Sequence, residues 1–334
     1  MKAFTLANPT SLEQALELLA AGNQRGSRGR AQILAGGQDL LTEMKEHLAE
    51  PEVLVNLKGI AGLDRIELDA SGTLTIGALA TIAAVEEHPG IRARFPALHE
   101  AARSIASPQI RSFGTVGGNL CQRPRCWYYR SEHAKCIKKG GSECFSHKGL
   151  NKYNAILGGG PSYIVHPSDL APALVALDAE VRLRGPEGER KLPIEKFFTL
   201  PSEGSVLKEN VLGDGEILVS VRVPAPAAGA RSTYLKFKER GSFDFALVSV
   251  AAVVLVEAGQ VARARLVLGG VAPIPWRSPE AEKALVGKAL DASAFGAAGE
   301  AAMLEADPLE YNAYKVPLAK GLIHRALQAL SRAG

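Results

Sequence analysis

Cysteine is the residue type whose positions in this sequence point most directly to chemistry. All four cysteines of the 334-residue chain lie between residues 121 and 144. Structural cysteines scatter through a protein core, whereas metal ligands must converge on one point. The clustering therefore favours a metal centre, with four candidate ligands: Cys121, Cys126, Cys136 and Cys144.

Positive charge is concentrated around the same cysteines. Residues 121–152 contain eight Lys and Arg and two acids, a balance of +6, while the whole chain has a formal net charge of +4. The rest of the chain therefore carries about −2, from 4 − 6. Four thiolates around a metal leave net negative charge, which must be compensated where the dielectric constant is low. The basic loop favours an anionic cluster over inert thiols.

The spacing of the cysteines leaves three interpretations open. A 4Fe–4S cluster takes four thiolates from a loop that wraps a large inorganic core. Structural zinc also takes four thiolates, but usually from two tight pairs, and here the gaps are four, nine and seven residues. Disulfides are the third interpretation, although a chain of this length does not need them for stability.

Two glycine turns have the character of phosphate-binding loops. AGGQDL at 35–40 lies between a predicted strand and a predicted helix, and TVGGNL at 115–120 is similar. Glycines permit positive φ and close backbone approach, and successive N–H groups form a nest for an anion at a helix start. Each turn alone also fits a plain tight turn. Two of them suggest a diphosphate and hence a dinucleotide, although neither matches the GxGxxG pattern.

Two polar positions elsewhere could orient a bound ring. In HPSDLAP at 166–172, Ser168 is a candidate helix cap, and Asp169 fits either the first helical turn or a carboxylate facing a ring. Lys236 and Arg240 lie in a stretch that alternates as a strand does. They fit a solvated face or a cation presented to an electron-rich ring.

The first two thirds of the chain alternate between short strands and helices. Residues 3–6 and 53–57 are predicted strands. Thr10 with Glu13 is predicted to form a capping box before a helix, and Thr81 to cap a later helix. We also predict one helix over about 92–106 and a strand, helix and strand over 162–185. This alternation predicts an α/β or α+β architecture.

The texture changes after Pro224, in the Pro-, Ala- and Gly-rich segment VPAPAAGARS. Three predicted strands follow, in a plausible antiparallel sheet, and the tail over about 279–332 is predicted to be helical. The sequence therefore predicts two domains, over 1–222 and 228–332.

Composition excludes several classes of protein. No apolar run reaches 18 residues, so no membrane span is predicted. Basic residues do not alternate with aromatic residues along a stripe, which disfavours nucleic-acid binding. The N-terminus has no signal-peptide pattern, so cytoplasmic residence is the default expectation, with export alongside a partner subunit as the alternative.

Several motifs taken together, in chain order, resemble one family. They are AGGQDL, IGALAT, SPQIRSFGTVGGNLC, HPSDLAPALVALDA and FALVSVAAVV, and the resemblance runs from about residue 3 to about residue 330. The family is that of the FAD-binding (medium) subunits of the molybdenum hydroxylases. The insertion after the GGN turn, at about 121–157, resembles a subgroup like the periplasmic aldehyde oxidoreductase and the β subunit of 4-hydroxybenzoyl-CoA reductase. In that subgroup the insertion carries a 4Fe–4S cluster.

The resemblance implies an α+β fold. A two-part FAD-binding domain of the vanillyl-alcohol-oxidase (PCMH) type would precede a small C-terminal α+β domain with a three-stranded antiparallel sheet. The four cysteines would bind the 4Fe–4S cluster. Residues that match the family's flavin positions would bind FAD: Ala35, Gly36, Gly37, Gln38, Asp39, Leu40, Ile105, Ala106, Thr115, Gly117, Gly118, Asn119, Asp169, Leu218 and Lys236.

The resemblance also implies a function. The chain would be the FAD and 4Fe–4S subunit of a heterotrimer, with the molybdenum cofactor in a large partner subunit and two 2Fe–2S clusters in a small one. Electrons from an aldehyde or aromatic substrate would leave through FAD to an acceptor. Because no catalytic triad, paired carboxylates or metal-histidine motif is found, no catalytic residue is assigned. The alternatives are a free-standing flavin oxidase and a zinc-stabilised cofactor-binding module.

Overall fold

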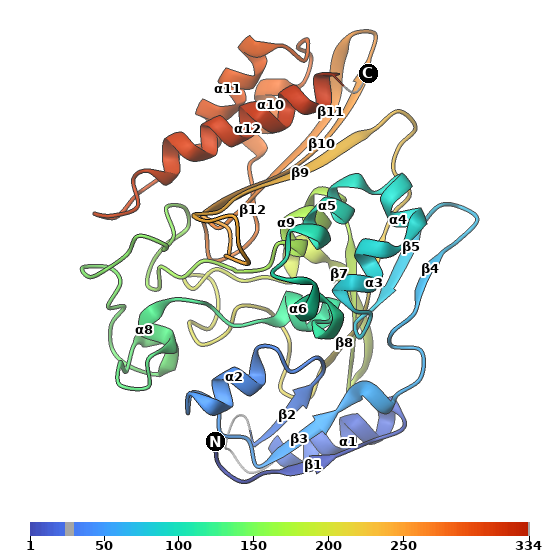
Figure 1. Cartoon of the computed structure of the whole chain (residues 1–334), viewed down its shortest axis with the longest axis vertical. Coiled ribbons are helices and arrows are strands. Elements are labelled where there is room, and N and C mark those ends of the chain that lie inside the picture. The colour runs from blue at the N-terminus through green and yellow to red at the C-terminus, as the bar shows by residue number, and fades with distance from the viewer. Residues whose placement is uncertain (24–29, 333–334) are drawn as a thin grey trace.

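The computed structural model describes residues 1–23 and 30–332. The N-terminal part is a three-stranded parallel sheet in the order β1-β3-β2, with two helices (Figure 1). Apolar side chains from α1 and the sheet form one core, in which Ala15 and Val55 are fully buried. The elements are β1 (Thr5–Ala7), α1 (Leu12–Asn23), β2 (Ala31–Leu34), α2 (Leu40–Lys45) and β3 (Val53–Asn56).

A second sheet has five antiparallel strands in the order β4-β5-β8-β6-β7. Segments far apart in the chain pair here, because β5 lies beside β8 and β8 lies beside β6. The two sheets account for the two parts expected of the first domain. The strands are β4 (Ile66–Leu68), β5 (Leu74–Gly77), β6 (Glu180–Gly185), β7 (Gly188–Pro193) and β8 (Ile217–Val223).

Short helices cover this second sheet. The predicted helix over about 92–106 is wrong as one element, because it is divided at Phe95, which has non-helical φ and ψ of −130° and 61°. Pro96 opens the next helix, where its missing N–H is not needed. The helices are α3 (Ile82–Glu87), α4 (Pro89–Arg94), α5 (Pro96–Ser104), α6 (Pro108–Phe113), α7 (Val116–Cys121) and α9 (Leu170–Ala176), with short 3₁₀ turns at Leu57–Gly59 and Ile194–Lys196.

Two further local predictions are corrected. Helix α1 is capped by Ser11, whose Oγ accepts from the Gln14 N–H at 3.2 Å, and not by a Thr10–Glu13 box. The Thr10 N–H instead donates to the Gln14 side chain at 3.0 Å. Residues 162–165 are extended but belong to no strand of the described sheets. The predicted cap of α3 is confirmed, since Thr81 Oγ1 accepts from the Ala84 N–H at 3.1 Å.

The insertion is mostly irregular. Residues 121–161, which are described throughout, contain α8 (Trp127–Arg130), a 3₁₀ turn at Ile137–Lys139 and no β-strand. Its C-terminal end is fixed by buried polar side chains from the C-terminal domain. Lys315, at the start of α12, donates to three backbone carbonyls, those of Tyr153, Asn154 and Gly270, at 2.9, 3.0 and 2.7 Å.

The C-terminal domain is an antiparallel sheet covered on one face by helices (Figure 1). The expected three strands are present, and a fourth, two residues long, pairs Trp276 with Leu268 and Arg277 with Val267. The predicted α+β fold class is therefore confirmed, with four strands in place of three. The elements are β9 (Arg231–Phe237), β10 (Val248–Glu257), β11 (Gln260–Gly269), β12 (Trp276–Arg277), α10 (Pro279–Leu285), α11 (Ala292–Ala302) and α12 (Lys315–Arg332).

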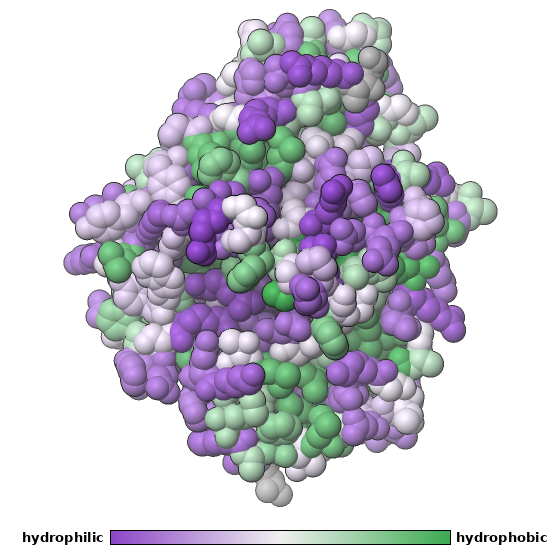
Figure 2. Space-filling model, in the orientation of Figure 1, coloured by the Kyte–Doolittle hydropathy of each residue, from purple (hydrophilic) through white to green (hydrophobic). Residues whose placement is uncertain are grey.

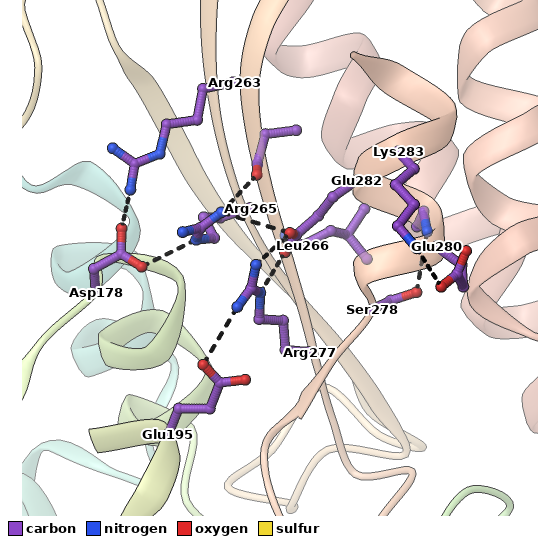
Figure 3. Close-up of polar contacts among 12 residues, drawn as sticks. Asp178, Glu195, Arg263, Arg265, Leu266, Arg277, Ser278, Glu280, Glu282 and Lys283 are labelled. Atoms are coloured by element: carbon purple, nitrogen blue, oxygen red, sulfur yellow. Dashed lines mark hydrogen bonds and ion pairs between the residues drawn. The ribbon is translucent and has the colours of Figure 1, made fainter. Parts of the chain in front are cut away.

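The other face of this sheet packs on the first domain. Tyr234, Ala251 and Val267 share one core cluster with residues of α5 and α9. Ion pairs continue the contact at the edge (Figure 3), where Asp178 binds Arg263 and Arg265. The two domains thus share apolar and charged contacts along one interface.

The surface view in Figure 2 shows a mixed face. Hydrophobic residues gather toward its lower part, where Figure 1 places the N-terminal sheet. Among the described residues, no helix is long and apolar enough to cross a membrane.

Candidate functional site

A cavity of about 550 Å³ lies where the N-terminal sheet, the helical layer and the C-terminal domain meet. Every residue that the sequence matched to a flavin position lines it, including the more distant Asp169, Leu218 and Lys236. These residues come from six separate segments of the chain. Their convergence on one hollow is the central observation about this site.

The first glycine turn presents free backbone donors to the cavity. The N–H groups of Gly36, Gly37 and Gln38 donate no hydrogen bond within the described part of the chain. Gly37 has φ of +75°, which a residue with a side chain adopts only with strain. Gly36 is required by packing, because a Cβ there would lie 2.1 Å from the carbonyl oxygen of Phe113. Three adjacent free amides suit a phosphate oxygen.

The second glycine turn differs, because its amides are already bonded. The Gly117 N–H donates to the Ala78 carbonyl at 2.8 Å, and the Gly118 N–H donates to Thr115 Oγ1 at 3.1 Å. A Cβ on Gly117 would lie 2.9 Å from the Cβ of Ala78. This turn therefore fits a close packing contact with β5 and a helix cap, and it borders the cavity without offering a nest.

A buried ion pair from two domains lies at the cavity wall. Lys236 on β9 donates to Asp169 Oδ2 at 2.7 Å and to the Ser104 carbonyl at 3.2 Å. Tyr234 donates to Asp169 Oδ1 at 2.5 Å, and burial raises the pKa of its hydroxyl well above the ordinary value. Asp169 does not cap α9, a role taken by Ser168, whose Oγ accepts from the Ala171 N–H at 3.0 Å. Its carboxylate is therefore held toward the C-terminal domain.

Asp39 has a role that its motif did not reveal. Its carboxylate accepts from Arg125 at 2.9 Å, from Arg130 at 2.8 Å and from the Arg123 N–H at 2.7 Å. Asp39 thus fixes the insertion to the first glycine turn. In the sequence, the only indication of this contact was an acidic residue in the glycine turn and a basic loop far from it along the chain.

These ion pairs give the basic loop a second explanation. Five of its eight basic residues pair with acids outside the loop, since Arg123 and Lys138 also bind Glu209, at 2.8 and 2.6 Å, and Lys152 binds Glu239 at 2.6 Å. These ion pairs attach the loop to the rest of the protein, so its positive charge has a role besides compensating the charge of a cluster.

Some residues around the cavity were missed by the motifs. Arg125 stacks over the ring of Phe245 at 5.0 Å, and Phe245 lies in the loop between β9 and β10. Phe243 and Asp244 of the same loop also line the cavity. Exposed aromatic residues in a turn, at Phe243 and Phe245, were the available signal.

The four cysteines are free thiols and do not all face the same space. Cys121 ends α7 and lines the flavin cavity, and burial raises the pKa of its thiol to about 12. Cys126 lines a second cavity, and its pKa is raised by burial and further by Cys144 nearby. Cys136 is buried. That Cys121 is a metal ligand stays a prediction.

The donors do not form a closed site for one ion. Among the described residues, no three His, Cys, Asp or Glu side chains lie close enough to hold a single metal ion together. Zinc requires such convergence, because all four ligands bind one atom. A cubane cluster holds its ligands farther apart, since each binds a different iron. The choice between zinc and a 4Fe–4S cluster therefore stays a prediction from the sequence.

Comparisons with known proteins agree over the full length. Residues 2–226 match the family described as the FAD binding domain in molybdopterin dehydrogenase, and residues 232–330 match the CO dehydrogenase flavoprotein C-terminal domain. The chain is 35% identical to the FAD-binding subunit of the aldehyde oxidoreductase of Escherichia coli (strain K12), over 96% of each chain. It is 32% identical to the carbon monoxide dehydrogenase medium chain of Hydrogenophaga pseudoflava, over 98% of this chain and 96% of that one.

Solved structures show the same fold. A chain of the reconstituted CO dehydrogenase from Oligotropha carboxidovorans superposes with a TM-score of 0.78 at 27% identity, covering 100% of this chain and 99% of that one. The cavity, its matched residues and these similarities lead to one conclusion. This chain belongs to the family of FAD-binding subunits of the molybdenum hydroxylases.

Proposed function

We propose that this chain is the FAD and 4Fe–4S subunit of a heterotrimeric molybdenum hydroxylase. Its partners would be a large subunit with the molybdenum cofactor and a small subunit with two 2Fe–2S clusters. It would pass electrons from these partners to an acceptor, after oxidation of an aldehyde or aromatic substrate in the large subunit. The names of two relatives support this, one a subunit of an aldehyde oxidoreductase and one a medium chain of a dehydrogenase.

The first glycine turn would bind the FAD diphosphate. The free N–H groups of Gly36, Gly37 and Gln38 would donate to phosphate oxygens, which a helix start also favours. The second turn would contact FAD without donating backbone hydrogen bonds, because its amides are already bonded. The absence of a side chain at Gly117 lets this turn pack closely against Ala78 in the cavity wall. FAD, when bound, takes up and releases electrons singly or in pairs, which joins one-electron clusters to a two-electron acceptor.

The ion pair of Asp169 and Lys236 would face the flavin ring. Each Asp169 oxygen accepts one hydrogen bond from the protein and keeps a second lone pair for a ring N–H. Ile105 and Ala106 line the same cavity and would pack on the ring. These residues bind and orient the flavin and exclude water from it.

The observation that carries the flavin assignment is the convergence of every matched residue on one cavity. Its test is the flavin content of the purified chain and of the complex made with its neighbouring genes. We expect about one FAD per chain, reduced by substrate only when the partner subunits are present. A chain that remains alone beside those partners, or that reduces an acceptor from substrate unaided, would contradict the subunit role.

The 4Fe–4S cluster would lie in the insertion, with cysteine thiolates as ligands. The exclusive placement of cysteine in this loop and the family resemblance support it. Iron and acid-labile sulfide should each be about four per chain, the stoichiometry of a cubane cluster. About one zinc per chain and no iron would contradict this proposal and favour the zinc-stabilised module.

A free-standing flavin oxidase is the second candidate. A second cavity of about 350 Å³ adjoins the first and shares Arg125, Pro167, Asp169, Asp244 and Phe245 with it. Such a space would admit a small substrate or an electron acceptor to the flavin. Flavin reduction by an aldehyde in the isolated chain would favour this candidate.

A further inference from the structure

Cys121 is separated from the other cysteines by its place in the fold. It ends α7, directly after the second glycine turn, and lines the flavin cavity. Cys121 therefore belongs to the wall of the flavin site.

The other three cysteines are linked to one another through the insertion. The Ile137 N–H donates to the Glu143 carbonyl at 2.8 Å, which places Cys136 and Cys144 on adjacent ends of one turn. The Asn154 side chain binds both Cys126 Sγ and the Tyr163 carbonyl, and Tyr163 lines one hollow with Cys144. These three thiols form a group from which Cys121 is absent.

An unpartnered hydroxyl follows the insertion in the chain. Ser162 is 1% exposed, and its Oγ has no hydrogen-bond partner within the described part of the chain. Buried hydroxyls are almost always bonded, because an unpaired one costs the desolvation of a polar group. The orphaned Oγ therefore implies a partner that the polypeptide does not supply.

The contacts of the next residue place Ser162 near two of the cysteines. The Asn154 side chain donates to the Tyr163 carbonyl at 3.0 Å and to Cys126 Sγ at 3.7 Å. The Tyr163 ring lines one hollow with Cys144. Tyr163, the residue after Ser162, is thus linked to Cys126 through Asn154 and shares a hollow with Cys144.

We propose that the cluster in the insertion is bound by Cys126, Cys136, Cys144 and Ser162, with Cys121 outside the ligand set. This inference rests on the proposed function, because it assumes that the insertion holds a 4Fe–4S cluster. On binding, the Ser162 O–H bond breaks, its proton leaves to solvent and an O–Fe bond forms. No electron is transferred in this exchange.

An oxygen ligand has measurable consequences. Alkoxide is a harder ligand than thiolate, so it favours oxidised iron and lowers the reduction potential of the cluster. The net charge of the ligand set is unchanged. The iron bound to Ser162 is also the one that a competing ligand or oxidant removes first.

Iron content and electron paramagnetic resonance of the purified subunit test the ligand set. Ser162→Ala should lose about one of four irons and give the spectrum of a three-iron cluster. Ser162→Cys should keep four irons, raise the reduction potential and slow iron loss to a chelator. Cys121→Ala, which leaves no donor atom at position 121, should keep the iron and sulfide of the wild type, with any change confined to the flavin.

The opposite pattern would overturn the inference. Loss of the cluster in Cys121→Ala, together with full iron and an unchanged potential in both Ser162 variants, would show that Cys121 and not Ser162 is the fourth ligand. Wild-type protein without iron would instead remove the cluster itself, which separates failure of the proposed function from failure of this ligand set. Ser278→Ala is the control for loss of a buried serine hydroxyl, because Ser278 is also buried but lies in the C-terminal domain, where its Oγ accepts from the Ala281 N–H at 3.3 Å.

Discussion

Most residues that line the flavin cavity lie at or near the ends of strands and helices, and the insertion contributes Cys121, Gln122, Arg123 and Arg125. The insertion itself contains two short helical turns and no strand. Backbone hydrogen bonds therefore fix the walls of the cavity, as the bonded amides of Gly117 and Gly118 illustrate. The insertion depends on side chains that reach it from elsewhere, including Asp39 and Lys315.

This difference predicts different behaviour in the two regions. Regular backbone structure positions the flavin residues before any ligand binds. The insertion is held by a few polar contacts, so a bound cluster would contribute a larger share of its order. Loss of FAD should therefore affect the flavin cavity and leave the insertion unchanged, and loss of the cluster should do the opposite.

The largest expected effect is on the flavin side. In Gly37→Val, the side chain would meet Leu41, where a Cβ lies 2.9 Å from Leu41 Cδ1, and φ of +75° would be strained. We expect FAD to be lost from the purified chain, with affinity lowered by about a thousandfold or more, or ~4 kcal/mol, while iron content stays at the wild-type level. Isothermal titration with FAD measures the loss.

Gly62→Val is the matched control for strain. Gly62 has φ of +85°, and it does not line the flavin cavity. It should lose stability without losing FAD. Equal FAD loss in both variants would show that backbone strain, and not the phosphate nest, explains the effect.

The reciprocal change is Cys136→Ala, which leaves no donor atom at this position. Cys136 is buried in the insertion and does not line the flavin cavity. We expect loss or degradation of the cluster with most of the FAD retained, because the cavity walls do not depend on it. The ratio of iron to FAD in the purified variant measures this, and parallel loss of both would mean that the two regions fold as one unit.

A third change concerns the attachment of the insertion. Lys315→Met keeps a long, unbranched side chain but removes three hydrogen bonds to backbone carbonyls, at 2.7 to 3.0 Å. Leaving buried carbonyls with fewer partners should lower the free energy of unfolding by about 2–4 kcal/mol. Urea denaturation measures the loss, and faster proteolysis within residues 121–157 would locate it.

Lys320→Met is the control for the third change. Lys320 lies on the same helix and pairs with Glu300 at the surface. An exposed pair contributes little, so its loss should cost below about 1 kcal/mol. Similar losses in both variants would contradict the anchoring role of Lys315.

Sequence reasoning reached the flavin side more completely than the insertion. Short motifs at glycine turns and a helix start are local, and the family resemblance aligned Asp169 and Lys236 although they are 67 residues apart. The four-stranded sheet was missed at β12, because a two-residue strand has no periodicity. The division at Phe95 was missed although Pro96 follows it.

The insertion was less predictable for a physical reason. Irregular backbone leaves no periodic pattern, so the cysteine spacing could not show that Cys121 faces the flavin cavity. The contacts of Asp39 and Glu209 with the loop join residues that are 71 to 91 positions apart, from 209 − 138 to 130 − 39. Counting charges in the sequence could not find these partners and assigned the positive charge to a cluster.

The smallest expected effect lies at the interface of the two domains. Tyr234→Phe removes the hydroxyl that donates to Asp169 Oδ1 at 2.5 Å and leaves the Lys236 contact in place. A hydrogen bond to a buried carboxylate should contribute about 1–2 kcal/mol to folding. The freed oxygen would also change the electrostatic environment of the flavin, so we expect a small shift in its reduction potential. Spectroelectrochemistry of the FAD-loaded variant measures the shift.

Tyr314→Phe is the control, because Tyr314 donates to the Lys152 carbonyl at 3.0 Å, outside the residues that line the flavin cavity. An unchanged flavin potential in Tyr234→Phe, with stability lowered as expected, would mean that Asp169 serves the domain interface and not the flavin.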